Sequence, residues 1–342
     1  MLKNLLGLVL FFAFSAVASA CNIPVFRYAL ERWRPDPCEI SIFYSGSLSP
    51  SEKDSLRKSL PDRVDGFRPS VSDPSRDSLG RLTLHDIHGL DGEQRALWDQ
   101  LNQHETVSFP HVLVRGSVGP SKEFVLWQGP LSGLQNAHLF SSPSRAEISR
   151  RLLAGHSIVW LMVTGKDEGK TAAVRSKLKA QLPKLQTQIQ LPEGIGLPGS
   201  ELFSDVPLLV KFSHLEIDYR DAKESFLIEL FSDIRPLEVS SGEPLVIPIF
   251  GRGRALEVIP GKDLTPELMT DLTLFLSGAC SCQVKDQNPG FDLLMNKNWT
   301  EELFPDGDPP PPSTSIKQGA GGRRTGRPEL LDIPSGRKLR LD

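Results

Sequence analysis

The sequence is poor in the features that define several protein classes. Its 342 residues hold 4 Cys, too few for a small fold built on disulfides, and 28 Gly, too few for collagen. Neither charge sign dominates, because 39 Lys and Arg face 42 Asp and Glu, so composition gives no general electrostatic reason to bind nucleic acid. The composition also excludes a coiled coil and a protein with several membrane spans. An ordinary globular protein of one or two domains remains.

The first 20 residues predict an export signal. Lys3 precedes an apolar run from Leu5 to Val17, and residues 18–20 are the small-x-small triplet Ala-Ser-Ala that signal peptidase reads. We therefore expect an exported protein of the cell envelope or periplasm, with a mature chain that begins near Cys21.

The residues before Cys21 resemble the lipobox of bacterial lipoproteins, although Ala18 stands where that family more often has Leu. The resemblance implies a lipid on Cys21 that anchors the protein to a membrane. Two alternatives stay open. Cleavage alone gives a soluble exported protein, and an unmodified Cys21 ahead of the helix-like residues 24–34 is a reactive thiol.

Hydrophobic patterning predicts the same order of elements twice. In the first half we expect strand 39–44, helix 50–60, strand 81–87, helix 93–102, strands 109–115 and 123–127, and helix 143–154. In the second half we expect strand 157–164, helix 168–185, strand 206–213, helix 222–231, strands 245–250 and 255–259, and helix 266–276. Residues 61–80 and 191–205 are predicted loops, and residues 305–342 a disordered tail rich in Pro, Gly and Arg.

This order predicts an α/β fold with a mixed sheet in each half and helices on both faces. It resembles the thioredoxin-like fold in tandem, with Pro110 and Pro248 where that fold carries a proline at its third core strand. We place the halves at residues 21–142 and 143–304; one larger α/β domain is the alternative. The redox cysteines of that family follow the first strand, yet residues 45–49 and 165–168 contain none. The scaffold is therefore expected without dithiol exchange at its usual place.

One segment imitates a phosphate-binding loop. Residues 164–171 follow a strand and open a helix, but three residues separate Gly165 from Gly169, where a P-loop has four. We expect no nucleotide and no other cofactor.

A second segment, residues 250–256, begins like a dinucleotide fingerprint. Leu256 replaces the third Gly, and the segment joins two strands. We interpret it as a hairpin in which Arg252 and Arg254 are candidates for contact with an anion or a partner.

Cys280 and Cys282 are the most chemically specific pair. Two thiols so close form a strained, oxidising disulfide or bind a soft metal such as Cu(I), with Cys38 or Cys21 as a resolving partner. Structural thiols or a structural disulfide are the alternative, because the preceding helix C-terminus disfavours a thiolate.

His85 and His88 look like a metal pair, but strand residues three apart point to opposite faces, so we expect surface or packing roles. The sequence also lacks a Gly-x-Ser-x-Gly elbow, and we favour a protein that is not an enzyme.

Residues 21–33 and 280–285, with Asn-Pro-Gly at 288–290, resemble an uncharacterised family of exported bacterial proteins across nearly the whole mature chain. The resemblance implies no activity. We therefore expect a non-catalytic, thioredoxin-like protein that binds an envelope protein or polymer. The alternative is a thiol redox or Cu(I)-handling protein that uses Cys280 and Cys282.

Overall fold

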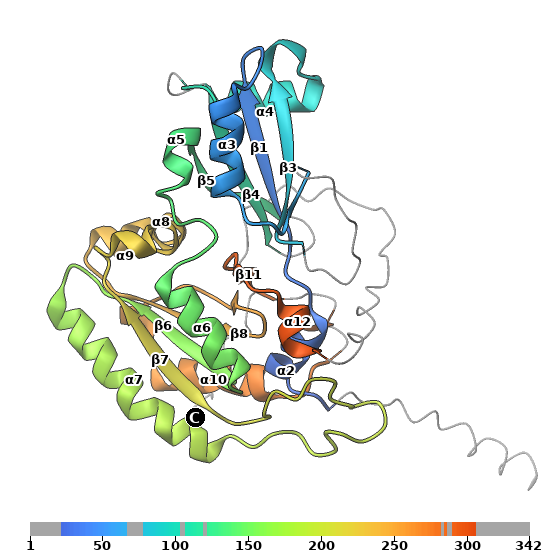
Figure 1. Ribbon diagram of the computed structural model, residues 1–342. Coiled ribbons are helices and arrows are strands. Elements are labelled where there is room, and N and C mark those ends of the chain that lie inside the picture. The colour runs from blue at the N-terminus through green and yellow to red at the C-terminus, as the bar shows by residue number, and fades with distance from the viewer. Residues whose placement is uncertain are drawn as a thin grey trace, which may run out of the picture.

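The computed structural model describes residues 22–66, 78–102, 107–118, 122–281, 284–285 and 289–305. Within these ranges the chain forms two mixed sheets with helices on their faces, as the sequence predicts (Figure 1). The predicted export segment, Cys21, Cys282 and all but the first residue of the predicted tail lie outside the described residues.

The first sheet lies in the upper part of Figure 1. Its elements are β1 (Cys38–Tyr44), α3 (Pro50–Ser59), β2 (Val64–Asp65), β3 (Gly80–Asp86), the 3-10 turn η1 (Ile87–Gly89), α4 (Gly92–Leu101), β4 (His111–Val118), β5 (Lys122–Pro130) and α5 (Leu131–Leu134). The strand order is β2-β3-β1-β4-β5, with β3 parallel and β4 antiparallel to β1. A hairpin of two antiparallel strands, β4 and β5, completes the sheet.

Local sequence explains the helices of this part. Ser49 caps α3 in a capping box with Glu52, and Pro50 occupies the first turn, where its missing N–H costs nothing. Asp91 caps α4 by accepting a hydrogen bond from the Gln94 amide. Both helices begin within one residue of the predicted positions.

The second sheet repeats the arrangement. Its elements are α6 (Pro143–Leu153), β6 (Ile158–Val163), α7 (Glu168–Gln188), β7 (Phe212–Ile217), η3 (Ala222–Glu224), α8 (Ser225–Ile234), α9 (Pro236–Ser240), β8 (Leu245–Phe250), β9 (Arg254–Ala255), β10 (Ile259–Pro260), η4 (Gly261–Asp263), α10 (Pro266–Ser277), β11 (Phe291–Asp292) and α12 (Trp299–Leu303). The order is β11-β9-β8-β6-β7, with β10 also paired to β8. β6 and β8 are buried along their full lengths because helices cover both faces of the sheet.

Two predicted strands differ from the structure. The strand expected at 206–213 is β7, which begins at Phe212 because that residue pairs with Ile158 of β6. The strand expected at 255–259 is two short pieces, β9 and β10, that pair with different parts of β8. In both places the pairing partner sets the strand limits: β6 for β7, and the neighbouring strand β8 for β9 and β10.

The helix expected to close the first half, α6, instead packs on β6 and β7 of the second sheet. The short α5 takes the place beside the first sheet, where it contacts α3 and β5. α6 therefore belongs with the second sheet, as the predicted boundary at residue 143 implies. The predicted repeat of elements had placed this helix at the end of the first half.

The segment before the first sheet also belongs with the second. α2 (Val25–Arg32) packs against α10 and β8, and Pro24 forms an antiparallel bridge with Ala279. The first sheet is thus inserted between α2 and the remainder of the second half, whereas the sequence division places α2 with the first half.

Three hydrophobic clusters form the core of the described residues. The largest joins the inner face of the first sheet to α8 and one face of the second sheet, and the next lies between the opposite face of the second sheet and α2, α7 and α10. A small cluster around Phe43, Trp98 and Leu113 lies under α4. Among the described helices, none is both long enough and apolar enough to cross a bilayer.

Candidate binding site

The candidate site lies at one end of the first sheet, at the top of Figure 1. β1 and β3 are parallel, so their carboxyl ends meet there, and antiparallel β4 begins at the same edge. Residues 45–49, residues 86–90 and the Phe109-Pro110 pair are therefore neighbours. In a sheet of this strand order, the loops at this end are where bound molecules make contact.

Polar groups cross-link the loops after β1 and β3. One carboxylate oxygen of Asp86 accepts hydrogen bonds from the amides of His88, at 3.1 Å, and Gly46, at 3.2 Å. These two bonds lower the pKa of Asp86 below its usual value. The hydroxyl of Ser45 lies 3.0 Å from Nε2 of His88, and both residues are exposed. The loops thus present a hydroxyl and an imidazole to solvent in a fixed arrangement.

Stacked aromatic side chains lie beside these loops and support the site. The Phe43 ring stacks on His85 at a centroid distance of 5.2 Å and lies 5.3 Å from Trp98. Trp98 in turn stacks on Phe109 at 5.3 Å. Phe109 is still 42% exposed, so a rigidly supported aromatic ring faces solvent. Such rings are common anchors of protein interfaces because they bury large areas with little loss of conformational entropy.

The start of β4 completes the site. The peptide bond between Phe109 and Pro110 is cis, and the Pro110 carbonyl accepts a hydrogen bond from the Leu131 amide at 2.9 Å. Burial lowers the pKa of His111 and also that of His85. Nδ1 of His111 is buried and has no hydrogen-bond partner in the described structure. An exposed ring beside imidazoles and hydroxyls suits binding of a mixed polar and apolar surface.

The corresponding end of the second sheet is closed. A Cβ atom on Gly165 would come within 2.2 Å of the Gly242 carbonyl oxygen. The Asp167 amide donates to that same oxygen at 3.2 Å, and Lys170 pairs with Glu243 at 2.7 Å. Pro248 is buried in the centre of β8 opposite Trp160, so the predicted match of Pro248 with Pro110 is wrong; Pro244, which directly precedes β8 as Pro110 precedes β4, takes that place. Chain segments of the second half therefore occupy the space that is open in the first.

The phosphate-loop-like segment is engaged internally as well. The Gly165 amide donates to the Thr171 hydroxyl at 3.0 Å, and Asp167 caps α7 by accepting from the Lys170 amide. The hydroxyl of Thr164 accepts a hydrogen bond from the Tyr219 amide. This turn joins β6, β7 and α7.

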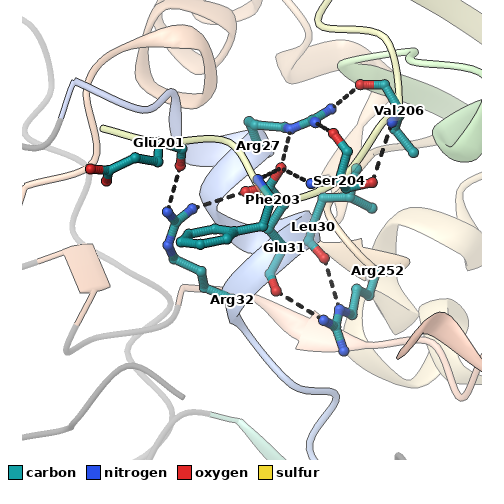
Figure 2. Close-up of polar contacts among 9 residues, drawn as sticks. All are labelled: Arg27, Leu30, Glu31, Arg32, Glu201, Phe203, Ser204, Val206 and Arg252. Carbon is teal, nitrogen blue, oxygen red and sulfur yellow. Dashed lines mark hydrogen bonds and ion pairs between the residues drawn. The ribbon is translucent and has the colours of Figure 1, made fainter. Parts of the chain in front are cut away.

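The hairpin arginines lie inside the protein. Arg252 donates from Nε to the Leu30 carbonyl at 2.8 Å and from Nη2 to the Glu31 carbonyl at 3.0 Å (Figure 2). Both acceptors belong to the C-terminal turn of α2. Arg252 therefore fixes α2 to the hairpin between β8 and β9.

Arg254 binds two carboxylates. Its Nη1 lies 3.0 Å from both Asp36 and Asp292, and its Nε donates to the Pro289 carbonyl at 2.9 Å. Burial raises the pKa of Asp292 to about 6. Arg252 and Arg254, the two predicted candidates for contact with an anion or a partner, thus both bind acceptors within this chain.

The described cysteines lie in different clusters. Cys38, at the start of β1, is buried in the largest cluster, and burial raises its pKa to about 12. Cys280 follows α10 and is buried in the cluster that also holds side chains of α2, and its amide donates to the Ile23 carbonyl at 2.9 Å. Cys21 and Cys282 lie outside the described residues, so the structure does not show the predicted pair together.

Sequence reasoning missed a buried ion pair in α2. Nε of Arg27 lies 2.8 Å from Glu31, and both side chains are almost completely buried (Figure 2). Arg27 also donates to the carbonyls of Ser204 and Val206, and Glu31 accepts from the amides of Phe203 and Ser204. The i,i+4 spacing of Arg27 and Glu31 was the available signal. The pair fastens α2 to the loop after α7.

A cleft of about 630 Å³ lies between α6 and residues 295–302. Its buried cation, Arg145, is surrounded by carbonyls, including those of His138 and Leu294, two residues with positive φ. Arg150 binds Glu147 through two hydrogen bonds, and Lys297 pairs with Glu302. The cations of this cleft therefore already have partners within the chain. Across the described residues, no group of three metal-ligating side chains comes together.

Comparison with known proteins adds no relative. No family model matches the chain, and no curated protein matches its sequence.

Proposed function

We propose that this protein is an exported, lipid-anchored protein of the cell envelope that binds a partner through the end of its first sheet and catalyses no reaction. The observation that carries the proposal is the exposed Phe109 ring, stacked on Trp98 beside a loop that contains no thiol. The partner is an envelope protein or polymer.

The strand order supports a thioredoxin-like topology. In the first sheet β3 and β1 are parallel neighbours, and β4 and β5 follow in antiparallel order; in the second sheet β7, β6 and β8 repeat this order, followed by the two-residue strand β9. In the first half, exposed Ser45, Gly46 and Ser47 occupy the loop after the first strand. Serine hydroxyls offer hydrogen bonds but no dithiol chemistry, which favours binding over redox catalysis.

A photo-crosslinking side chain at position 109 tests this function. With the full chain in its native membranes, we expect a discrete adduct from position 109, because that ring is exposed yet firmly supported. The matched control places the same crosslinker at position 237, since Leu237 is 78% exposed and lies far from the site on α9. The proposal fails if both positions give the same products.

Thiol redox or Cu(I) handling at Cys280 and Cys282 is the competing proposal. The burial of Cys280 counts against it, because a thiolate or a metal ligand must be reached by its partner. Replacing both residues with Ser separates the two proposals. We expect the adduct at position 109 to persist; loss of disulfide reduction or of Cu(I) binding by the variant would instead support the thiol proposal.

A further inference from the structure

Two stretches of chain connect the first sheet to the rest of the protein. Residues 33–37 run from α2 to β1, and residues 135–142 run from α5 to α6. Residues 289–304, which contain β11 and α12, are bonded to both connections and are called the strap below. Figure 1 shows β11 beneath the first sheet, between it and the second.

A buried arginine of β9, Arg254, joins the strap to the first connection. On the strap it binds the Asp292 carboxylate at 3.0 Å and the carbonyls of Pro289 and Gly290. On the connection it binds Asp36, also at 3.0 Å. The Asp36 amide in addition donates directly to the Asp292 carboxylate at 2.5 Å. The strap and the first connection therefore share one guanidinium and one carboxylate.

A second buried arginine, Arg145 of α6, joins the strap to the second connection. Its Nη1 donates to the Leu139 carbonyl at 2.7 Å, and its Nη2 donates to the His138 carbonyl. The same Nη1 lies 3.2 Å from the Leu293 carbonyl and 3.3 Å from the Leu294 carbonyl of the strap. One guanidinium thus holds backbone oxygens of the strap and of the second connection together.

The strap also contacts the first half itself. Arg63, which lies between α3 and β2, donates from Nη1 to the Lys297 carbonyl. Trp299 is fully buried, and it shares the largest hydrophobic cluster with Leu303 and the inner face of the first sheet. Parts of one chain that are joined by short connections move relative to one another unless an interface holds them. Here the strap supplies a large part of that interface.

The backbone is strained where the strap meets the second connection. Among the described residues, the non-glycine residues with positive φ are His138, at 47°, and Leu294, at 49°. A side chain makes this left-handed conformation unfavourable. The two residues belong to different segments, yet both of their carbonyls accept hydrogen bonds from Arg145. Strained conformations persist only where surrounding contacts hold them, and they are frequent in elements that switch between states.

We propose that the strap is a releasable lock: when it leaves Arg145 and Arg254, the first half swings about residues 33–37 and 135–142 while both sheets stay folded. Release lets His138 and Leu294 return to unstrained conformations, which offsets part of the cost of the lost contacts. The candidate binding site lies at the opposite end of the first sheet, at the top of Figure 1, so this motion changes the direction in which the site points. The inference goes beyond the proposed function and does not depend on what the site binds.

The double change Asp36→Ala with Arg63→Gln tests the lock in the full chain. It removes the contacts that the first connection and the first half make through these side chains, and it leaves Arg254 paired with Asp292. Spin labels on noncanonical amino acids at the exposed positions 57 of α3 and 179 of α7 report the distance between the halves. We expect a distance distribution about twofold wider than in the unchanged protein, because the first half can then rotate about its connections.

The matched control makes the same two kinds of change elsewhere. Asp218→Ala with Arg220→Gln removes an exposed ion pair after β7 and should leave the distribution unchanged. Amide hydrogen exchange in β1 and β6 should be the same in both variants, since the sheets stay folded. Equal widths for the two variants would overturn the proposal. Loss of protection in β1 and β6 together with the strap would also overturn it, because the sheets and the strap would then open as one unit.

His138→Gly gives a second measurement with the opposite sign. Glycine adopts a positive φ without strain, so the locked state gains stability and the strap opens less often. We expect the amides of residues 291–304 to exchange about threefold more slowly than in the unchanged protein. His88→Gly, at a position without positive φ, is the control and should leave this exchange unchanged. Equal or faster exchange in His138→Gly would show that strain does not favour release and would contradict the lock.

Discussion

The two halves have the same strand order but differ at the ends of their sheets where loops are free to vary. After β1, a Cβ atom on Gly46 would meet no atom within 4 Å; at the matching place after β6, one on Gly165 would be 2.2 Å from a backbone oxygen. One fold thus supplies an open end in the first half and a sealed end in the second. Shared topology does not imply shared use, because function depends on the individual site.

Segments from both ends of the described chain pack against the second half. α2 enters its core from one side, and residues 289–304 add β11 and α12. Buried arginines fasten these segments: Arg27 and Arg252 hold α2, and Arg254 holds the segment around Asp292. The second half is therefore a closed support, and the first half projects from it with one end free.

The largest effect expected is on the fastening of α2. Arg27→Ala leaves the Glu31 carboxylate buried without its cation, and loss of one partner from a buried pair costs about 3–5 kcal/mol. Urea unfolding measures this loss. Arg57→Ala, at an exposed position of α3, is the control and should change stability by less than about 1 kcal/mol. Similar midpoints for both variants would show that the support does not depend on this pair.

The paired glycines provide a direct test of the open and sealed ends. Gly165→Ala should destabilise the protein by about 3 kcal/mol because its new methyl group meets the Gly242 backbone. Gly46→Ala should cost about 1 kcal/mol, since space is open there and only the positive φ of 77° opposes the side chain. Thermal or urea unfolding of the two variants side by side is sufficient. A larger loss for Gly46→Ala would break the comparison.

The smallest effect expected is a pH dependence of the free energy of unfolding that arises from His156 in the second half. Burial, with Lys211 and Arg151 nearby, lowers the pKa of His156 to about 4. Between pH 6.5 and 4 the unfolded chain then binds more protons at this position than the native protein, so this residue makes stability fall as pH falls. His156→Gln removes that contribution, and its urea midpoint should decline less between pH 7 and 5. Parallel declines for the variant and the unchanged protein would contradict the assignment.

Local patterns were sufficient to predict much of the fold. Ser142 and Thr265, each followed by Pro, mark the starts of α6 and α10 as capping rules require. The two apolar runs of β6 and β8 also lie where patterning places them. These features depend on neighbours in sequence, and for that reason a single sequence reveals them.

Features set by distant contacts were not predictable. The sequence around Arg252 is typical of an exposed hairpin, and its burial depends on the carbonyls of α2. The sequence of α6 likewise does not indicate which of the two sheets the helix packs on. The contact of Ser45 with His88 depends on the parallel pairing of β1 and β3, which brings together loops that are far apart in sequence. The aromatic support of Phe109 by Trp98 likewise appears only when α4 lies on the sheet.

The insertion of the first sheet after α2 in the sequence also affects the order in which the two halves fold. α2 is among the first segments of the folded body to be synthesised, yet the Arg252 that binds its carbonyl at Leu30 follows 222 residues later. Until that part of the chain has emerged, the apolar side of α2 has no partner, and contacts at such sequence separation form late. The first sheet can assemble in the interval, so we expect the projecting half to be complete before the support that carries it.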